Sequence, residues 1–158
     1  MLPLAEPRGG EAAVALTEPE SGGVLEQMGG PGTAASLARL LSRVQSAVRE
    51  ELCPPGPGEP PLLLSGALLT RLQPPPGDDD GGGTTAYDYS APHVDQANVP
   101  DYEYSAVLYL NGKGGPGGFE GGDFAFVDEG MDEALEPRPG RCVVFGSGRG
   151  NLHRAGRG

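Results

Sequence analysis

The sequence has no tryptophan, and phenylalanine and tyrosine together make up only 6% of its 158 residues. Large aromatic side chains contribute much of the apolar area buried in protein cores, so this composition predicts one core of modest size. Two cysteines, Cys53 and Cys142, argue against a dense disulfide framework and leave the redox compartment open. Basic residues are also scarce, 11 against 22 acidic ones, and the net charge is −11. This acidity disfavours nucleic acids and anionic membranes as partners, and solubility is its simplest explanation.

Long apolar runs are absent as well. No stretch approaches the roughly 20 apolar residues that a membrane-spanning helix requires. The first residues, Met1–Arg8, lack the basic start and apolar centre of a secretory signal, so we expect neither a signal peptide nor a membrane span in this chain. Glycine and proline are abundant instead, at 28 and 17 residues, a proportion at which irregular segments are common.

One helical pattern stands out near the start of the chain. Residues 1–32 are rich in glycine, proline and glutamate and are expected to be mostly irregular. Apolar residues then recur at spacings of three and four, the helical period: Leu37, Leu40, Leu41, Val44, Val48 and Leu52. We expect a helix from about Ala34 to Glu51, capped by Thr33 or Ser36 and ended by the two prolines that follow.

Two further segments precede the middle of the chain. The apolar run of residues 62–72 predicts a turn followed by a buried strand, and a helix is the alternative because the run is short. Residues 74–83 contain three consecutive aspartates among prolines and glycines. Adjacent side chains do not converge on one point, so we expect a solvated acidic loop there rather than a metal site.

Beyond Thr84 the sequence changes to short apolar segments separated by turn residues. Aromatic and β-branched residues predict strands at 87–94, 104–110, 123–127 and 141–145. The prolines and glycine of residues 135–140 predict a turn before the last of these. Short strands at such close spacing indicate an all-β sandwich or barrel.

The only two histidines supply the most specific signal in the chain. His93-Val94-Asp95 is followed at a distance by His153. Two imidazoles and one carboxylate form the facial triad of non-haem Fe(II) oxygenases, which leaves three positions open on the metal. On a strand, residues 93 and 95 project from one face, and the short loop 146–150 would bring His153 round to them. A lone His-x-Asp is more often a surface pair or a hydrogen-bonded core histidine, so the flanking motifs decide.

Those motifs resemble a known family. The blocks, in chain order, are His93–Asp95, Tyr104–Asn111, Phe119–Val127, Pro137–Phe145 and Asn151–His153. Together they resemble the 2-oxoglutarate- and Fe(II)-dependent oxygenase superfamily over about residues 84–155. The prolyl-hydroxylase-like branch, with the prolyl 4-hydroxylases and the leprecan-type prolyl 3-hydroxylases, is the most similar. Within it, the "2-oxoglutarate and iron-dependent oxygenase domain-containing" members share the most features.

The resemblance implies a mainly β fold, a double-stranded β-helix (jelly roll), with residues 34–52 as its supporting helix. The domain is then expected over residues 33–158. His93, Asp95 and His153 match the family's iron ligands, and Tyr109 matches a position that donates a hydrogen bond to 2-oxoglutarate. The Gly121-Gly122 pair matches a turn beside the active site, where close backbone approach or a bulge is expected.

The resemblance also implies an activity. Members use Fe(II), 2-oxoglutarate and O₂, commonly with ascorbate, to hydroxylate an unactivated C–H bond, and they release succinate and CO₂. The branch suggests a peptide or protein substrate hydroxylated at a residue such as proline. It also allows the endoplasmic reticulum or a membrane-anchored full-length form as the location.

One departure from the family pattern concerns the co-substrate. Members continue past the distal histidine through a further strand, whose Arg or Lys pairs with the far carboxylate of 2-oxoglutarate. The sequence ends at Gly158, and Arg154 and Arg157 lie too close to His153 to match that position. We therefore expect the jelly roll to be incomplete at its C-terminus. The alternatives are a non-catalytic jelly-roll binding module and a Zn- or Mn-binding cupin-like protein, although cupins typically use more histidines.

Overall fold

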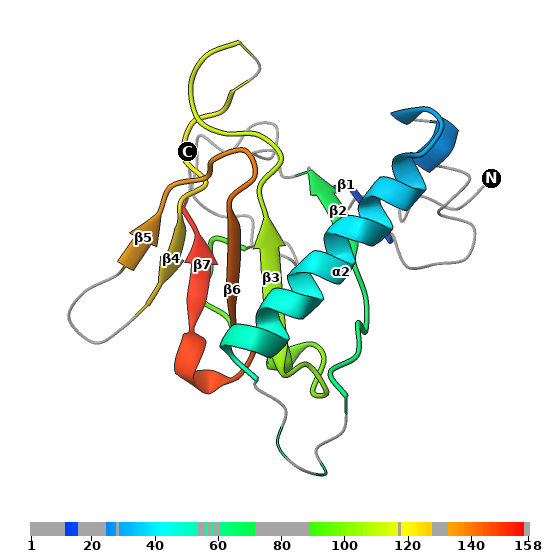
Figure 1. Cartoon of the computed structure of the whole chain (residues 1–158). Helices are drawn as coiled ribbons and strands as arrows, with labels where there is room; N and C mark the ends of the chain where they lie inside the picture. Colours follow the sequence, from blue (N-terminus) through cyan, green and yellow to red (C-terminus); the bar gives the residue numbers. More distant parts are fainter. Residues whose placement is uncertain are drawn as a thin grey trace. The chain divides into compact units, whose positions relative to one another are not determined.

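The computed structural model describes residues 12–15, 25–27, 29–53, 56, 58, 61–71, 89–116, 118–127 and 133–156. The chain divides into two compact units, Met1–Gly83 and Thr84–Gly158, and Figure 1 shows their elements. The boundary between the two units lies within the domain that was predicted over residues 33–158. The extent of that domain stays a prediction.

The first unit contains the long helix. Helix α2 (Thr33–Glu51) confirms the helix predicted from the apolar period, and Val48 on its apolar stripe is buried. The helix is followed by Leu52 as its C-cap, just before the two prolines, as expected. No helix among the described residues combines the length and the apolar character that crossing a membrane requires.

The N-terminal cap of α2 differs from the prediction. Neither Thr33 nor Ser36 caps the helix; the N-cap residue is Gly32, with a φ of 89°. The carboxylate of Glu26 accepts hydrogen bonds from the backbone N–H groups of Gly32 and Ala34, at 2.7 and 3.1 Å. An acidic group at this end of a helix also interacts favourably with the helix dipole. The cap therefore comes from a side chain six residues before Gly32, outside the window that a local cap motif covers.

A two-stranded sheet completes the described part of this unit. Strand β1 (Ala12–Ala15) pairs antiparallel with β2 (Leu68–Arg71). Strand β1 lies in the segment expected to be mostly irregular. Within residues 62–72 the strand prediction is confirmed over the helix alternative, but the expected burial is wrong, because Leu63, Leu64 and Leu68 are exposed. The acidic loop 74–83 lies outside the described residues.

The second unit is mainly β. Its described elements are η1 (Asp95–Ala97), β3 (Tyr104–Leu108), β4 (Phe124–Phe126), β5 (Glu133–Leu135), β6 (Cys142–Gly146), η2 (Arg149–Asn151) and β7 (His153–Ala155), where η denotes a 3-10 helix. Strand β3 pairs with β6, and β4 lies between β5 and β7; all pairs are antiparallel. Figure 1 shows the two sheets next to each other. The described strands do not close into a barrel.

Three of the four strand predictions in this unit are confirmed, as β3, β4 and β6. The strand predicted at 87–94 is wrong over its described part. Tyr89 and Ser90 form a turn, and only His93 takes part in a β-bridge. Pro92 explains the difference, since it has no N–H to donate to a neighbouring strand. Strands β5 and β7 were not predicted, because neither lies in a run of alternating apolar residues like the one around β4.

The turn predicted before β6 is confirmed. The carbonyl of Arg138 accepts a hydrogen bond of 2.9 Å from the N–H of Arg141, across Pro139 and Gly140. Proline at the second position and glycine with a φ of 81° at the third define a type II turn. Arg138 pairs with the carboxylate of Glu136 at 2.8 Å, and Arg141 donates to the Glu136 carbonyl at 2.6 Å.

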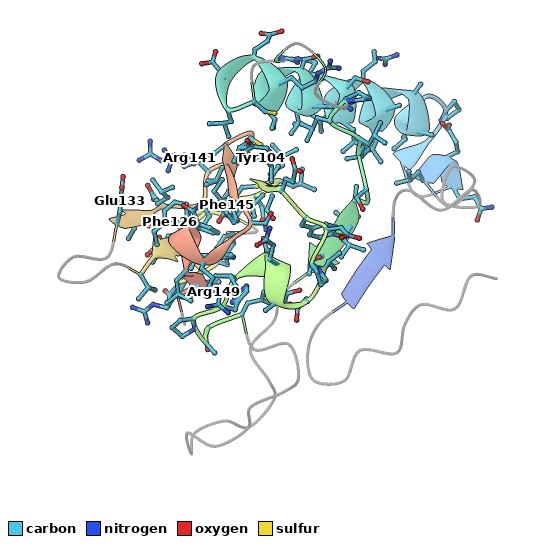
Figure 2. The ribbon with its side chains drawn as sticks, turned by 90° about the horizontal axis from the view of Figure 1, so that it is seen from below. Tyr104, Phe126, Glu133, Arg141, Phe145 and Arg149 are labelled. Carbon is cyan, nitrogen blue, oxygen red and sulfur yellow. The ribbon has the colours of Figure 1, made fainter. Side chains whose placement is uncertain are left out.

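The two sheets of the second unit share one hydrophobic core, centred on Phe124, Val143 and Phe145. Val143 and Phe145 alternate with more exposed neighbours along β6, so both project from the same face of that strand. Partly buried side chains of β3, β4 and β5 and of Tyr109 pack against them. In Figure 2, Phe126 and Phe145 lie among the strands, whereas Glu133 points outward from β5.

Candidate metal centre

A pair of backbone hydrogen bonds brings the two histidines together. His93 and His153 exchange N–H to carbonyl hydrogen bonds of 2.9 and 3.0 Å across an isolated antiparallel bridge. Residues paired in this way place their side chains on the same face, and the two imidazole centroids are 4.4 Å apart. On its other side His153 pairs with Phe126 of β4, so the histidine pair is anchored in the three-stranded sheet.

Asp95 reaches the same place by a route that differs from the prediction. Val94 is extended, with φ −123° and ψ 140°, but Asp95 begins the 3-10 helix η1 and not a second strand position. Its carbonyl accepts backbone hydrogen bonds from Asn98 and Val99, at 3.0 and 3.1 Å. The expected strand alternation of residues 93 and 95 is therefore wrong, yet the two side chains still meet.

Three donor atoms converge at this point. Asp95 Oδ1 lies 3.6 Å from His153 Nε2 and 3.9 Å from His93 Nε2. One ligand atom from each residue lies within 4.8 Å of the other two. At these separations the carboxylate hydrogen-bonds neither imidazole. Metal–nitrogen bonds of about 2.1 Å place adjacent donors roughly 3 Å apart, so small side-chain rotations would bring all three onto one ion.

Backbone carbonyls select the tautomer of both histidines. Nδ1 of His93 lies 2.9 Å from the carbonyl oxygen of Ala91, and Nδ1 of His153 lies 2.9 Å from that of Asn151. A carbonyl only accepts hydrogen bonds, so each Nδ1 carries the proton and donates it. In a neutral imidazole this leaves the lone pair on Nε2, the atom that faces Asp95. The same arrangement orients metal-bound histidines in proteins.

The site is closed on one side and open on the other. The His153 side chain is only 6% exposed, against 23% for His93 and 26% for Asp95. The His153 ring stacks on Phe124 at 5.1 Å and 18°, and it meets Phe145 at 4.7 Å and 61°. These aromatic neighbours restrict the rotation of the buried imidazole and exclude water behind it. A metal ion and any further ligand would enter from the side of His93 and Asp95.

His93, Asp95 and His153 fit a divalent metal ion. Within the described residues, this is the one group of three such side chains whose ligand atoms lie this close together. Two imidazoles and one carboxylate suit Fe(II) and leave three coordination positions for other ligands. The triad contains no thiolate, the ligand type that would favour a softer metal.

Comparison with known families decides the assignment. Residues 72–157, more than half of the chain, match the family described as the 2OG-Fe(II) oxygenase superfamily. The chain belongs to this superfamily. The matched region contains all three candidate ligands, and the resemblance drawn from the sequence motifs is confirmed. Membership supports an oxygenase function in general terms.

Curated relatives carry this domain in their names. A protein of Xenopus tropicalis named "2-oxoglutarate and iron-dependent oxygenase domain-containing protein 3" is 44% identical over 71 residues, which cover 44% of the chain and 22% of that protein. Proteins of the same name from Rattus norvegicus and Homo sapiens are 42% identical over 71 residues, with the same coverage. The chain thus spans about a fifth of the length of these relatives. No solved structure gives a significant match to the chain.

Tyr109, the 2-oxoglutarate contact expected from the family resemblance, lies just past β3. Its backbone N–H donates to the Arg141 carbonyl at 2.9 Å, and its side chain packs against the hydrophobic core. Burial, and to a lesser degree the nearby Asp123 carboxylate, raise the pKa of the Tyr109 hydroxyl above its ordinary value; Arg141 acts in the opposite direction. The hydroxyl is therefore protonated at neutral pH and able to donate a hydrogen bond. Its contact with 2-oxoglutarate stays a prediction.

Replacing Asp123 with asparagine is expected to lower the pKa of Tyr109, because the neighbouring negative charge is lost. It would also remove the carboxylate that pairs with the Lys113 ammonium at 2.6 Å. The difference in phenolate absorbance between each protein and its Tyr109→Phe derivative, followed through an alkaline titration, isolates this one tyrosine. Since folding raises the pKa of Tyr109, the stability that this tyrosine contributes is fully present below its unfolded pKa of about 10 and is lost as pH rises through its higher folded-state pKa. An unchanged titration in Asp123→Asn would contradict the proposed interaction.

The glycine pair beside the sheet shows the close backbone approach that was expected. Gly121 and Gly122 have φ values of 69° and 70°, a region that side-chain-bearing residues rarely adopt. The N–H of Gly122 donates to the carbonyl of Gly156, just after β7, at 2.9 Å. A Cβ at Gly122 would also lie 3.0 Å from the Phe119 ring. The pair thus connects the start of β4 to the end of the strand that begins at His153.

Sequence reasoning missed the residues that surround the triad. Phe124 was recognised only as part of a strand, and its stacking on His153 depends on the register of β4 with β7. Gln96 and Ser147, which connect η1 to the segment after β6, showed no signal beyond their proximity to Asp95 and His153 in sequence.

Proposed function

We propose that this chain carries the iron-binding core of an Fe(II)- and 2-oxoglutarate-dependent dioxygenase built on a double-stranded β-helix. His93, Asp95 and His153 would be the ferrous ligands. The observation that carries the proposal is the convergence of two Nε2 atoms and one carboxylate, with each Nδ1 donating to a backbone carbonyl. This arrangement prepares both imidazoles for metal binding before any ion is present.

The proposed reaction consumes O₂ and 2-oxoglutarate and hydroxylates a C–H bond, releasing succinate and CO₂. When bound, the iron supplies this oxidation chemistry, and the protein supplies binding and orientation. Phe124 and Phe145 would exclude water behind His153. Tyr109 would donate a hydrogen bond from its neutral hydroxyl to 2-oxoglutarate. The partly exposed side of His93 and Asp95 would leave room for co-substrate and substrate.

The substrate class rests on the resemblance to the prolyl-hydroxylase-like branch. We propose a peptide or protein substrate hydroxylated at a residue such as proline, with ascorbate to restore oxidised iron. The same resemblance allows the endoplasmic reticulum or a membrane-anchored form as the location and does not decide between them.

Anaerobic titration of the chain with Fe(II), with and without 2-oxoglutarate, tests the proposed function. A keto acid chelated to ferrous iron gives a weak visible charge-transfer band, which is expected only when both are present. The band should vanish in His153→Ala. Iron binding without the band would contradict the co-substrate site in this chain. Failure to bind iron would overturn the dioxygenase proposal in favour of a non-catalytic binding module, and selective binding of Zn²⁺ or Mn²⁺ would favour the cupin-like alternative.

A further inference from the structure

The position of Asp95 depends on a short element with little stability of its own. Asp95 is the first residue of η1, a 3-10 helix of three residues. Such helices have poorer hydrogen-bond geometry than α-helices and are held in place mainly by their surroundings. The contacts that hold η1 therefore determine where the Asp95 carboxylate lies relative to the two histidines.

Gln96, the next residue, makes two such contacts. Its backbone N–H donates to the carbonyl of Ser147 at 3.1 Å, and its side-chain amide donates to the carbonyl of Tyr102 at 2.8 Å. The first bond ties η1 to the segment that leads to His153. The second bond connects Tyr102, which follows η1, back to this short helix. Gln96 thus connects the segments that carry two of the candidate ligands.

Ser147 provides a rigid attachment point for this connection. Its side chain is buried, and its hydroxyl lies 2.8 Å from that of Ser105 on β3. Its N–H donates to the carbonyl of Glu103 at 2.9 Å. The carbonyl that accepts from Gln96 is therefore fixed by the β3–β6 pair, which also forms the core behind His153.

The neighbouring Gly148 indicates how closely the Gln96 side chain fits. Its φ of −83° and ψ of −175° are open to any residue, so the backbone conformation does not require glycine. A Cβ added there would lie 3.1 Å from Gln96 Oε1, tighter than ordinary van der Waals contact. A larger residue at 148 would press on the Gln96 amide.

We infer that Gln96 is a positioning residue, which holds the Asp95 carboxylate close enough to His153 for both side chains to bind one metal ion. The inference rests on the proposed function, since it assigns Gln96 a role toward the same metal. Gln96 touches neither metal nor substrate and acts through η1. Loss of residues that orient metal ligands typically weakens metal affinity by about 10- to 100-fold, and we expect about 10-fold for Gln96→Ala.

Metal binding measured with Mn²⁺ as the probe tests the inference without turnover. The loss of the free-ion electron paramagnetic resonance signal gives the dissociation constant, and circular dichroism of the metal-free proteins reports folding. Gln96→Ala and Gln96→Met should both bind Mn²⁺ about 10-fold more weakly with the fold retained, because neither side chain can donate to Tyr102. Gln45→Ala is the matched control: it removes an equivalent amide-to-carbonyl bond, to Leu62 at 2.7 Å, in the first unit, and should bind as the native chain does.

Gly148→Ala supplies a second, independent test. It should weaken Mn²⁺ binding in the native background and have no further effect in Gln96→Ala, because it acts through the Gln96 side chain. Native affinity in a folded Gln96→Ala overturns the inference and leaves the proposed function intact. If Gln96→Ala fails to fold, native affinity in Gly148→Ala overturns it instead. If the native chain itself binds neither Mn²⁺ nor Fe(II), the proposed function fails and the inference falls with it.

Discussion

Replacing Asp95 with alanine is expected to weaken Fe(II) binding by more than about 100-fold, since loss of a ligand should exceed the 10- to 100-fold cost of losing a group that merely orients one. Asp95 Oδ1 lies 3.9 and 3.6 Å from the Nε2 atoms of His93 and His153, and Asp95 is the only carboxylate residue of the candidate triad. Anaerobic titration with a competing chelator measures the affinity. The 2-oxoglutarate charge-transfer band should be absent at iron concentrations that saturate the native chain.

The stability of the same variant separates metal binding from folding. The Asp95 side chain is partly exposed and hydrogen-bonds neither imidazole, so its removal should cost the metal-free chain little stability. The metal-free variant should therefore unfold at nearly the native temperature. A ligand at 100 times its dissociation constant stabilises the native state by about 2.7 kcal/mol, and Asp95→Ala should lose this stabilisation by Fe(II).

Asp101→Ala is the control for Asp95→Ala, because Asp101 is an exposed aspartate in the same loop region that does not belong to the triad. It should retain both the affinity and the thermal shift on adding iron. Undiminished iron binding in Asp95→Ala would contradict the proposed ligand set, whatever the result with His153→Ala.

Replacing Phe124 with alanine is expected to lower the free energy of unfolding by about 3–5 kcal/mol, the usual cost of removing a buried phenylalanine ring. The side chain is only 5% exposed, and its ring lies 5.0 to 5.3 Å from the rings of Phe126, Phe145 and His153. The substitution would leave a cavity at the centre of the core shared by both sheets. Denaturant unfolding monitored by circular dichroism measures the change.

Two further variants define the origin of this loss. Phe124→Leu keeps most of the volume and should cost less stability than alanine, yet it removes the ring that stacks on His153. Leu110→Ala is the surface control, since Leu110 is 65% exposed and its truncation should change stability by less than about 0.5 kcal/mol. If Phe124→Ala were as stable as the Leu110 variant, the core assigned to the second unit would be wrong.

The candidate ligands could be predicted from sequence because their chemistry restricts the choice of residue. The chain has only two histidines, and one of them stands two residues before an aspartate. The structure brings these three side chains together. The geometry within His93-Val94-Asp95 could not be predicted in the same way. Pro92 prevents regular pairing before His93, and η1 begins at Asp95.

Helix α2 and strands β3, β4 and β6 were determined by the sequence itself, because an apolar period of 3.6 or 2 is a local property that the chain carries in any context. Contacts between distant segments were decided only by the tertiary structure. These are the backbone pairing of His93 with His153 and the connection from Gln96 to Ser147. Each joins groups whose proximity depends on the packing of other elements, so no local pattern encodes it. The identity of the candidate ligands is therefore local information, whereas their geometry is a property of the fold.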